Sequence, residues 1–163
     1  MTIIDLVFLP KYLKIRFILA LQSWLSSFKL FVYCQKNGCN ISHKSNITGD
    51  FSRLIVGKGT VINSYANLRF KQGNITIGQG CLFGQNVTIL ANTYDIQDNL
   101  PISSKRMFAK DVIIGDFVWV GTNAVILPGV SIGSNAIIGS SAVVTHNVPE
   151  GEVWGGIPAR FIK

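Results

Sequence analysis

Residues 113–149 have the sequence IIGDFVWVGTNAVILPGVSIGSNAIIGSSAVVTHNVP, in which an aliphatic residue recurs at every sixth position. Glycine follows most of these residues, and a small or β-branched residue precedes each of them by two positions. A period of six matches neither the 3.6-residue repeat of a helix nor the two-residue alternation of a strand. The recurring aliphatic residues are Ile114, Val120, Ile126, Ile132, Ile138 and Val144.

A hexapeptide solenoid accounts for this period. Three repeats make one triangular turn, the aliphatic residue points into the prism, and glycine or asparagine is expected at the corners, where a positive φ costs little. Stacked turns pair as parallel strands about 4.8 Å apart. The repeat therefore predicts an all-β fold, a left-handed parallel β-helix. The segment before it is predicted to contain an N-terminal amphipathic helix.

The same pattern extends toward the N-terminus, so the β-helix domain is expected to cover residues 38–163. Between Ile89 and Ile114 the phase of the repeat is lost, and the polar stretch 93–110 is predicted to be a loop that leaves the coil. The earlier repeat positions are Ile41, Ile47, Val56, Ile62, Leu68, Ile77, Phe83 and Ile89.

Residues 1–37 form a separate segment that carries much of the net charge of +7, with five basic residues and one acid. Within residues 11–33, aromatic and aliphatic residues recur at helical spacing. The uncharged run within it is too short to span a bilayer. Two interpretations stay open: a helix that covers the end of the coil, or a helix lying in the plane of an anionic membrane through residues 1–33.

Composition excludes several classes of protein. The three cysteines and two histidines, Cys34, Cys39, Cys81, His43 and His146, lack metal-ligand spacing, so no metal site is expected. The chain contains none of the motifs typical of nucleic-acid binding. A reducing cytoplasm, with possible attachment to the inner face of the membrane through the basic end, fits these features best.

The strings quoted above and the ending GGIPARFIK (155–163) resemble the hexapeptide-repeat acetyltransferases, in particular the maltose/galactoside-type and polysaccharide O-acetyltransferases. The resemblance covers roughly residues 38–163. It implies a homotrimer with sites between neighbouring prisms, acetyl-CoA as cosubstrate, and a sugar or lipid-linked glycan as acceptor.

The resemblance also implies roles for individual residues. The acetyl-CoA candidates are Trp119 at the groove, Thr122 near the thioester, Ser140 at the pantetheine amides, and Thr145, His146 and Arg160 at the phosphates. Asn67 stands at the family's acceptor-binding asparagine. Five of these positions also have a structural interpretation: Trp119 as an interface aromatic, Ser140, His146 and Asn67 as turn or corner residues, and Arg160 as an ion-pair partner of Glu150 or Glu152.

One departure from the family concerns the general base. Where the family has histidine at the start of the loop, this chain has Tyr94, with Asn92 before it and Asp95 after it. A tyrosine, with an unperturbed pKa of about 10, is a poor base near neutral pH, and general-base assistance is worth about 10²–10⁴-fold. Asp95 as base, His43 or His146 from a neighbouring subunit, or an amine acceptor would each compensate.

The function indicated is transfer of an acetyl group from acetyl-CoA to a sugar hydroxyl in surface-polysaccharide, O-antigen or capsule assembly. Two alternatives stay open: N-acetylation of a nucleotide-linked amino sugar, and a CoA-binding or structural β-helix that has lost its base. A β-helix carbonic anhydrase is excluded, because it needs three histidine ligands for zinc.

Overall fold

The computed structural model describes residues 11–94, 101 and 106–163. The chain divides into two compact units, of which the first ends at Lys36 and the second covers Asn37–Lys163. The first unit holds a long helix, and the second holds the coil of strands.

The helix α2 (Lys11–Asn37) ends immediately before Gly38, whose φ of +64° is the left-handed conformation common at helix C-termini. Trp24 and Phe28 stack one turn apart with ring centroids 5.7 Å from each other. Ile15 and Leu19 are also exposed, on the side of the helix away from these rings, so the apolar surface is broader than one stripe. Among the described residues, no helix is long and apolar enough to cross a membrane.

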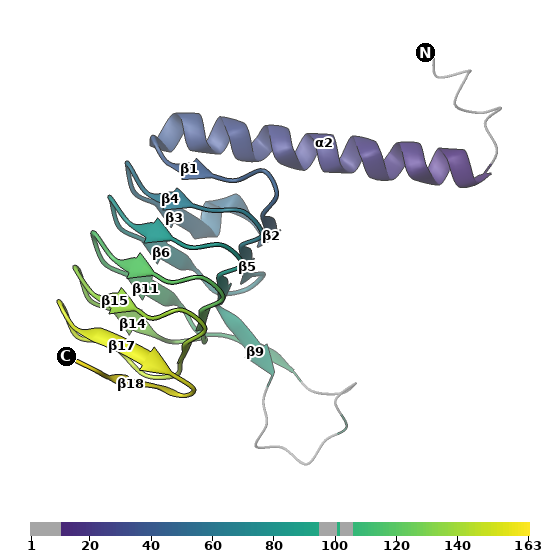
Figure 1. The fold of residues 1–163 in the computed structure, drawn as a ribbon. Helices are drawn as coiled ribbons and strands as arrows, with labels where there is room; N and C mark the ends of the chain where they lie inside the picture. Colours follow the sequence, from purple (N-terminus) through teal and green to yellow (C-terminus); the bar gives the residue numbers. More distant parts are fainter. Residues whose placement is uncertain (1–10, 95–100, 102–105) are drawn as a thin grey trace. The chain divides into compact units, whose positions relative to one another are not determined.

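Short strands in the second unit form three sheets whose strands succeed one another turn by turn (Figure 1). Sheet A holds β1 (Asn40–Ile41), β4 (Val61–Ile62), β7 (Leu82–Phe83), β12 (Trp119–Val120), β15 (Ile137–Ile138), β17 (Val153–Gly156) and, antiparallel at its end, β18 (Ala159–Phe161). Sheet B holds β2 (Asn46–Gly49), β5 (Asn67–Phe70), β8 (Thr88–Leu90), β13 (Val125–Ile126) and β16 (Val143–Val144). Sheet C holds β3 (Leu54–Val56), β6 (Ile75–Ile77), β11 (Val112–Ile114) and β14 (Ser131–Ile132), and a short 3₁₀ helix, η1 (Phe51–Arg53), precedes it.

The repeat residues form continuous buried columns inside the coil. In sheet A, Ile62 pairs with Phe83, Phe83 with Val120, and Val120 with Ile138, and each is at most 1% exposed. The residues two positions earlier, such as Val118 and Ala136 (not in these strands), are buried as well. The parallel coil that the repeat predicts is therefore confirmed, while its left-handed sense stays a prediction.

The turns differ in length. Val120 pairs with Ile138 in the C-terminal part, whereas Ile62 pairs with Phe83, so the earlier turn is three residues longer. The extra length includes the end of β5, where the fully buried ring of Phe70 lies against Gly49 of the preceding turn. The break in phase between Leu68 and Ile77 thus reflects three extra residues, which widen this turn of the coil.

The repeat glycines have a different role from the one expected. Gly115 has no positive φ; that conformation falls two residues later, on Phe117 with φ 57°. Asn123 and Asn135, at φ 61°, occupy the equivalent corners, as predicted for asparagine. A Cβ on Gly115 would lie 2.6 Å from the backbone nitrogen of Ser134. The repeat glycines therefore permit the close approach of the next turn.

The excursion between β8 and β11, predicted as a loop over residues 93–110, begins and ends as two short paired strands. β9 (Asn92–Tyr94) pairs antiparallel with β10 (Met107–Ala109), with Tyr94 opposite Met107 and Asn92 opposite Ala109. Figure 1 shows β9 projecting from the side of the coil. The alternation that favours a strand is obscured in sequence because each arm is only three residues long.

The glycine packing predicts that Gly115→Ala lowers the free energy of unfolding by about 1–3 kcal/mol, because its methyl group would overlap the backbone of the next turn. Gly139→Ala is the matched control, since the nearest atoms to its added Cβ are 3.5 Å away. Thermal and urea unfolding of both variants measure the difference. Equal losses in the two variants would contradict this account.

Candidate active site

The excursion is held at both ends by residues 73–74. The carboxylate of Asp111 accepts hydrogen bonds from the Asn74 backbone nitrogen at 2.8 Å and from its side-chain Nδ2 at 2.9 Å. These bonds, the side-chain bond foremost, hold the pKa of Asp111 below its ordinary value. At the other end, Gly73 lies against Ala91, and the carbonyl oxygen of Ala91 accepts from the Lys110 nitrogen at 3.1 Å. These contacts therefore fix the place at which the two arms of the excursion, β9 and β10, leave the coil.

An open cleft of about 250 Å³ lies where these arms meet the side of sheet B. Its lining comes from two parallel strands of the coil and from the two arms. Thr48 and Arg69 are register partners on β2 and β5, and Tyr94, which is 47% exposed, is the partner of Met107. The lining residues are Thr48, Arg69, Lys71, Asn92, Tyr94 and Met107.

Two asparagine side chains near this region have unused hydrogen-bonding capacity. The side-chain oxygens of Asn67 and Asn92 are buried and accept no hydrogen bond from the described residues. An unpaired buried acceptor costs about 1–3 kcal/mol, so such groups often serve a ligand. Asn92 lines the cleft, whereas Asn67 lies on the outer side of β5, two residues before Arg69.

Of the three predicted catalytic residues, the structure brings Asn92 and Tyr94 into one cleft. Asp95 lies outside the described residues. Arg69 and Lys71 were missed by the sequence analysis. The signal was the alternation in residues 67–71, where buried Leu68 and Phe70 leave the intervening residues on the outer face. The break in the repeat at this place concealed that alternation.

The predicted acetyl-CoA residues fall on two other parts of the coil. Trp119 is exposed on the outer face of sheet A, between Leu82 and Ile137 on the neighbouring strands. Thr122 and Ser140 follow β12 and β15 at the same corner. They stack on consecutive turns, since the carbonyl oxygen of Thr122 accepts from the Ser141 nitrogen at 2.8 Å.

Thr145 and His146 lie at a different corner, after β16 of sheet B, with the Thr145 Oγ1 and His146 Nδ1 atoms 2.7 Å apart. Arg160 is in β18, exposed, and its guanidinium donates to the carbonyl oxygen of Ala159 at 2.8 Å. Glu152, an expected partner of Arg160, instead accepts from Trp154 Nε1 at 2.7 Å. The guanidinium of Arg160 retains donors for a phosphate.

The cleft and Trp119 do not share a face of the coil. Tyr94 extends from the side of sheet B, whereas Trp119 is on sheet A. One chain therefore presents the acceptor candidates and the cofactor-groove candidates on separate surfaces. Among the residues that the structure describes, no group of three His, Cys, Asp or Glu side chains could hold a metal ion.

Comparison with known proteins agrees with this architecture. Residues 111–146 match the family described as bacterial transferase hexapeptide, six repeats. The chain is 36% identical over 124 residues to a putative acetyltransferase of Bacillus subtilis. The aligned region covers 75% of this chain and 67% of the relative. The chain thus belongs to the hexapeptide-repeat transferases, a family that includes acetyltransferases.

Two further similarities are to acetyltransferases. The chain is 35% identical over 142 residues to the galactoside O-acetyltransferase of Escherichia coli, covering 87% of this chain and 61% of that relative. A solved hexapeptide-repeat acetyltransferase of Vibrio cholerae, complexed with acetyl coenzyme A, superposes with a TM-score of 0.68 at 25% identity, over 85% of this chain and 76% of that one. This chain therefore spans about three fifths of the length of the galactoside enzyme.

The phosphate contact that the family resemblance implies for Arg160 predicts a contribution to cofactor affinity. Arg160→Ala is expected to weaken CoA binding by about 1.5–3 kcal/mol, because a charge-assisted bond to phosphate is lost. Calorimetric titration with CoA measures the loss, and Lys58→Ala, which removes a cation between β3 and β4, is the control. Unchanged affinity in Arg160→Ala would remove this residue from the site.

Proposed function

We propose that the protein transfers an acetyl group from acetyl-CoA to a hydroxyl of a sugar in a surface polysaccharide. The observation that carries this proposal is the cleft at the base of the excursion, with Asn92 and Tyr94 at the place of the family's catalytic loop. It is supported by the family membership and by the similarity to a galactoside O-acetyltransferase. Acetyl-CoA enters as a substrate, and Trp119, Thr122 and Ser140 are its proposed contacts along sheet A.

In the proposed reaction, the acceptor oxygen attacks the thioester carbonyl carbon and the carbon–sulfur bond breaks. The acetyl group is now bonded to the acceptor oxygen. The hydroxyl proton is transferred to the departing thiolate, giving the free thiol of CoA. Asn92 is proposed to orient the acceptor through its unpaired side chain. Tyr94 supplies a hydrogen-bonding phenol at the position where the family has a base.

A homotrimer is proposed because a single chain separates the two halves of the site. Three prisms around a common axis can set sheet A of one copy opposite the sheet B side of the next. That arrangement would bring Trp119 of one subunit to the cleft of its neighbour. His43 and His146 would then also be available as bases from a neighbouring subunit.

The missing histidine provides a test of the acceptor atom. Tyr94→His is expected to raise the rate of hydroxyl acetylation by at least about tenfold, since general-base assistance is worth about 10²–10⁴-fold. Release of the CoA thiol with a glycan acceptor measures the rate, and Tyr94→Phe is the control for loss of the phenol hydroxyl. A rate that stays flat or falls in Tyr94→His would favour the alternatives, an amine acceptor or another base.

Peripheral membrane contact through residues 1–33 is also proposed, which would place the enzyme at the inner face of the membrane beside a lipid-linked acceptor. The exposed stacked rings of Trp24 and Phe28, with Lys29 and Lys36 on the same helix, support this proposal. These features fit an in-plane helix at an anionic surface.

The membrane proposal predicts that Trp24→Ala with Phe28→Ala reduces binding of the full chain to anionic vesicles by at least about tenfold, because burial of an aromatic side chain contributes about 1.5–3 kcal/mol. Co-sedimentation with phosphatidylserine-containing vesicles measures the loss. Phe161→Ala removes an equally exposed ring from the coil and should leave binding unchanged. Full-length protein that stays in the supernatant would overturn the proposal.

A further inference from the structure

The cleft that contains Tyr94 is also lined by two cations, Arg69 and Lys71. We infer that the acceptor bound there carries an acidic group, a carboxylate or a phosphate, beside the sugar ring. The inference rests on the proposed function, since it takes this cleft to be the acceptor site. It specifies the chemical class of the acceptor, which neither the fold nor the missing histidine defines.

The two cations are placed by the coil. β5 pairs with β2 and β8 on either side, and its buried residues Leu68 and Phe70 are both 0% exposed. The intervening outward positions therefore have a rigid backbone. Arg69 projects beside Thr48 of the preceding turn, and Lys71 follows Phe70 at the end of the strand. Strand pairing on both sides thus holds the backbone of Arg69 beside the cleft, and Lys71 follows two residues later.

The cleft contains no compensating charge among its described lining residues, which include no carboxylate. Two acids of the described residues close in sequence to the cleft or to its arms already accept hydrogen bonds elsewhere: Asp50 from the Ser52 nitrogen at 3.0 Å, and Asp111 from the Asn74 nitrogen at 2.8 Å. The backbone bond from Ser52 is the main reason that the pKa of Asp50 is lowered. Two like charges on one wall repel each other, and an anionic ligand would relieve that repulsion.

A neutral sugar would not need these groups. Thr48, Asn92 and Tyr94 already offer hydroxyl and amide partners for sugar hydroxyls. Arg69 adds a planar guanidinium that can bind a carboxylate or phosphate through two parallel hydrogen bonds, and Lys71 adds a point charge. The volume of about 250 Å³ is at the small end for ligand clefts, which suits one acidic sugar unit.

The test compares three probes that share a galactose ring: methyl galactoside, methyl galacturonoside and galactose 1-phosphate. Their dissociation constants are measured by NMR titration of the full-length protein. At least one acidic probe should bind about tenfold or more tightly than the neutral probe. The tighter of the two acidic probes identifies carboxylate or phosphate as the group recognised. Added sodium chloride should weaken only the acidic probes.

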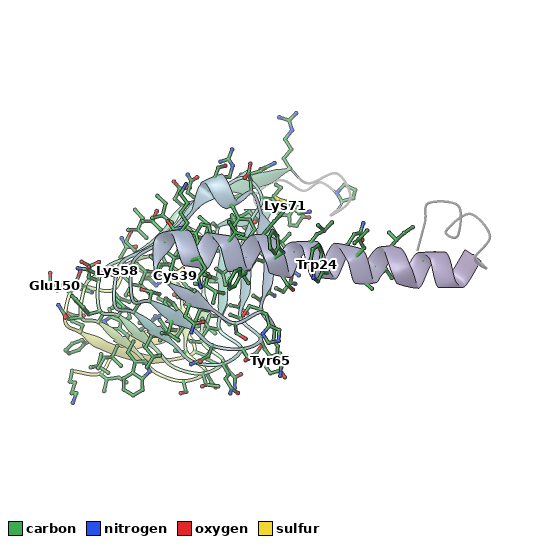
Figure 2. The ribbon with its side chains drawn as sticks, turned by 90° about the horizontal axis from the view of Figure 1, so that it is seen from above. Trp24, Cys39, Lys58, Tyr65, Lys71 and Glu150 are labelled. Carbon is green, nitrogen blue, oxygen red and sulfur yellow. The ribbon has the colours of Figure 1, made fainter. Side chains whose placement is uncertain are left out.

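Substitutions then connect the preference to the cleft. Arg69→Gln and Lys71→Gln should each remove most of the acidic preference while leaving binding of the neutral probe within about twofold. Lys58→Gln removes the same charge from another place around the coil, as Figure 2 shows, and should keep the preference. Both target side chains are exposed, and Lys71→Gln gives an independent test if Arg69→Gln unfolds.

The outcomes separate this inference from the proposed function. Equal affinity for acidic and neutral probes, no binding of either acidic probe, or a preference that also disappears in Lys58→Gln would overturn the inference. Acetylation of a neutral acceptor, detected as release of CoA thiol, would in that case leave the proposed function intact. Binding of an acidic probe through Arg69 and Lys71 without any acetyl transfer would support the inference and count against the proposed function.

Discussion

The close stacking of successive turns is the constraint on which the rest of the structure depends. Successive turns stack about 4.8 Å apart, and at corners such as Gly115 an added Cβ would lie 2.6 Å from the backbone of the next turn, so these residues must lack a Cβ. Inside the prism, the same stacking aligns aliphatic residues of equal position into columns. Pairing with the neighbouring turns therefore sets the register of each turn. The same pairing fixes where the outward-facing residues lie on the surface.

This pairing explains how the coil can support an excursion without losing its register. Residues 91–111 lie between β8 of sheet B, which pairs with β5, and β11 of sheet C, which pairs with β6. The hydrogen bonds between Asn74 and Asp111 hold the C-terminal end of this insertion to the coil. The arms β9 and β10 carry Asn92 and Tyr94 to the cleft, whereas Arg69 is supplied by the coil itself. The cleft thus combines one wall on a strand paired on both sides, β5, with one on the short ladder of β9 and β10.

Sequence periodicity could predict the coil because every inward position obeys one rule, burial of an aliphatic side chain. Periodicity could not show whether a repeat glycine is required for close packing against the next turn or for a positive φ, because glycine meets both requirements. The structure distinguishes them, since the positive φ falls on Phe117 and Asn123. Tyr94 and Asn92 could be found because the resemblance to the family places its histidine-containing string at the start of the loop. Arg69 and Lys71 could not be found from the sequence. The cleft that they line is formed by strand pairing across two turns and by the arms β9 and β10, which have no repeat.

The substitution at Tyr94 carries functional information because the fold places little demand on that position. Its side chain is 47% exposed at the end of a three-residue arm, so a histidine there would cost little stability. Repeat positions such as Ile89 are fully buried and are constrained by packing, which makes their identity uninformative about chemistry. Arg69 is likewise exposed, on a strand whose stability comes from Leu68 and Phe70. Packing therefore does not impose the departure from the family at Tyr94 or the two cations in the same cleft, and under the proposed function both act on the acceptor.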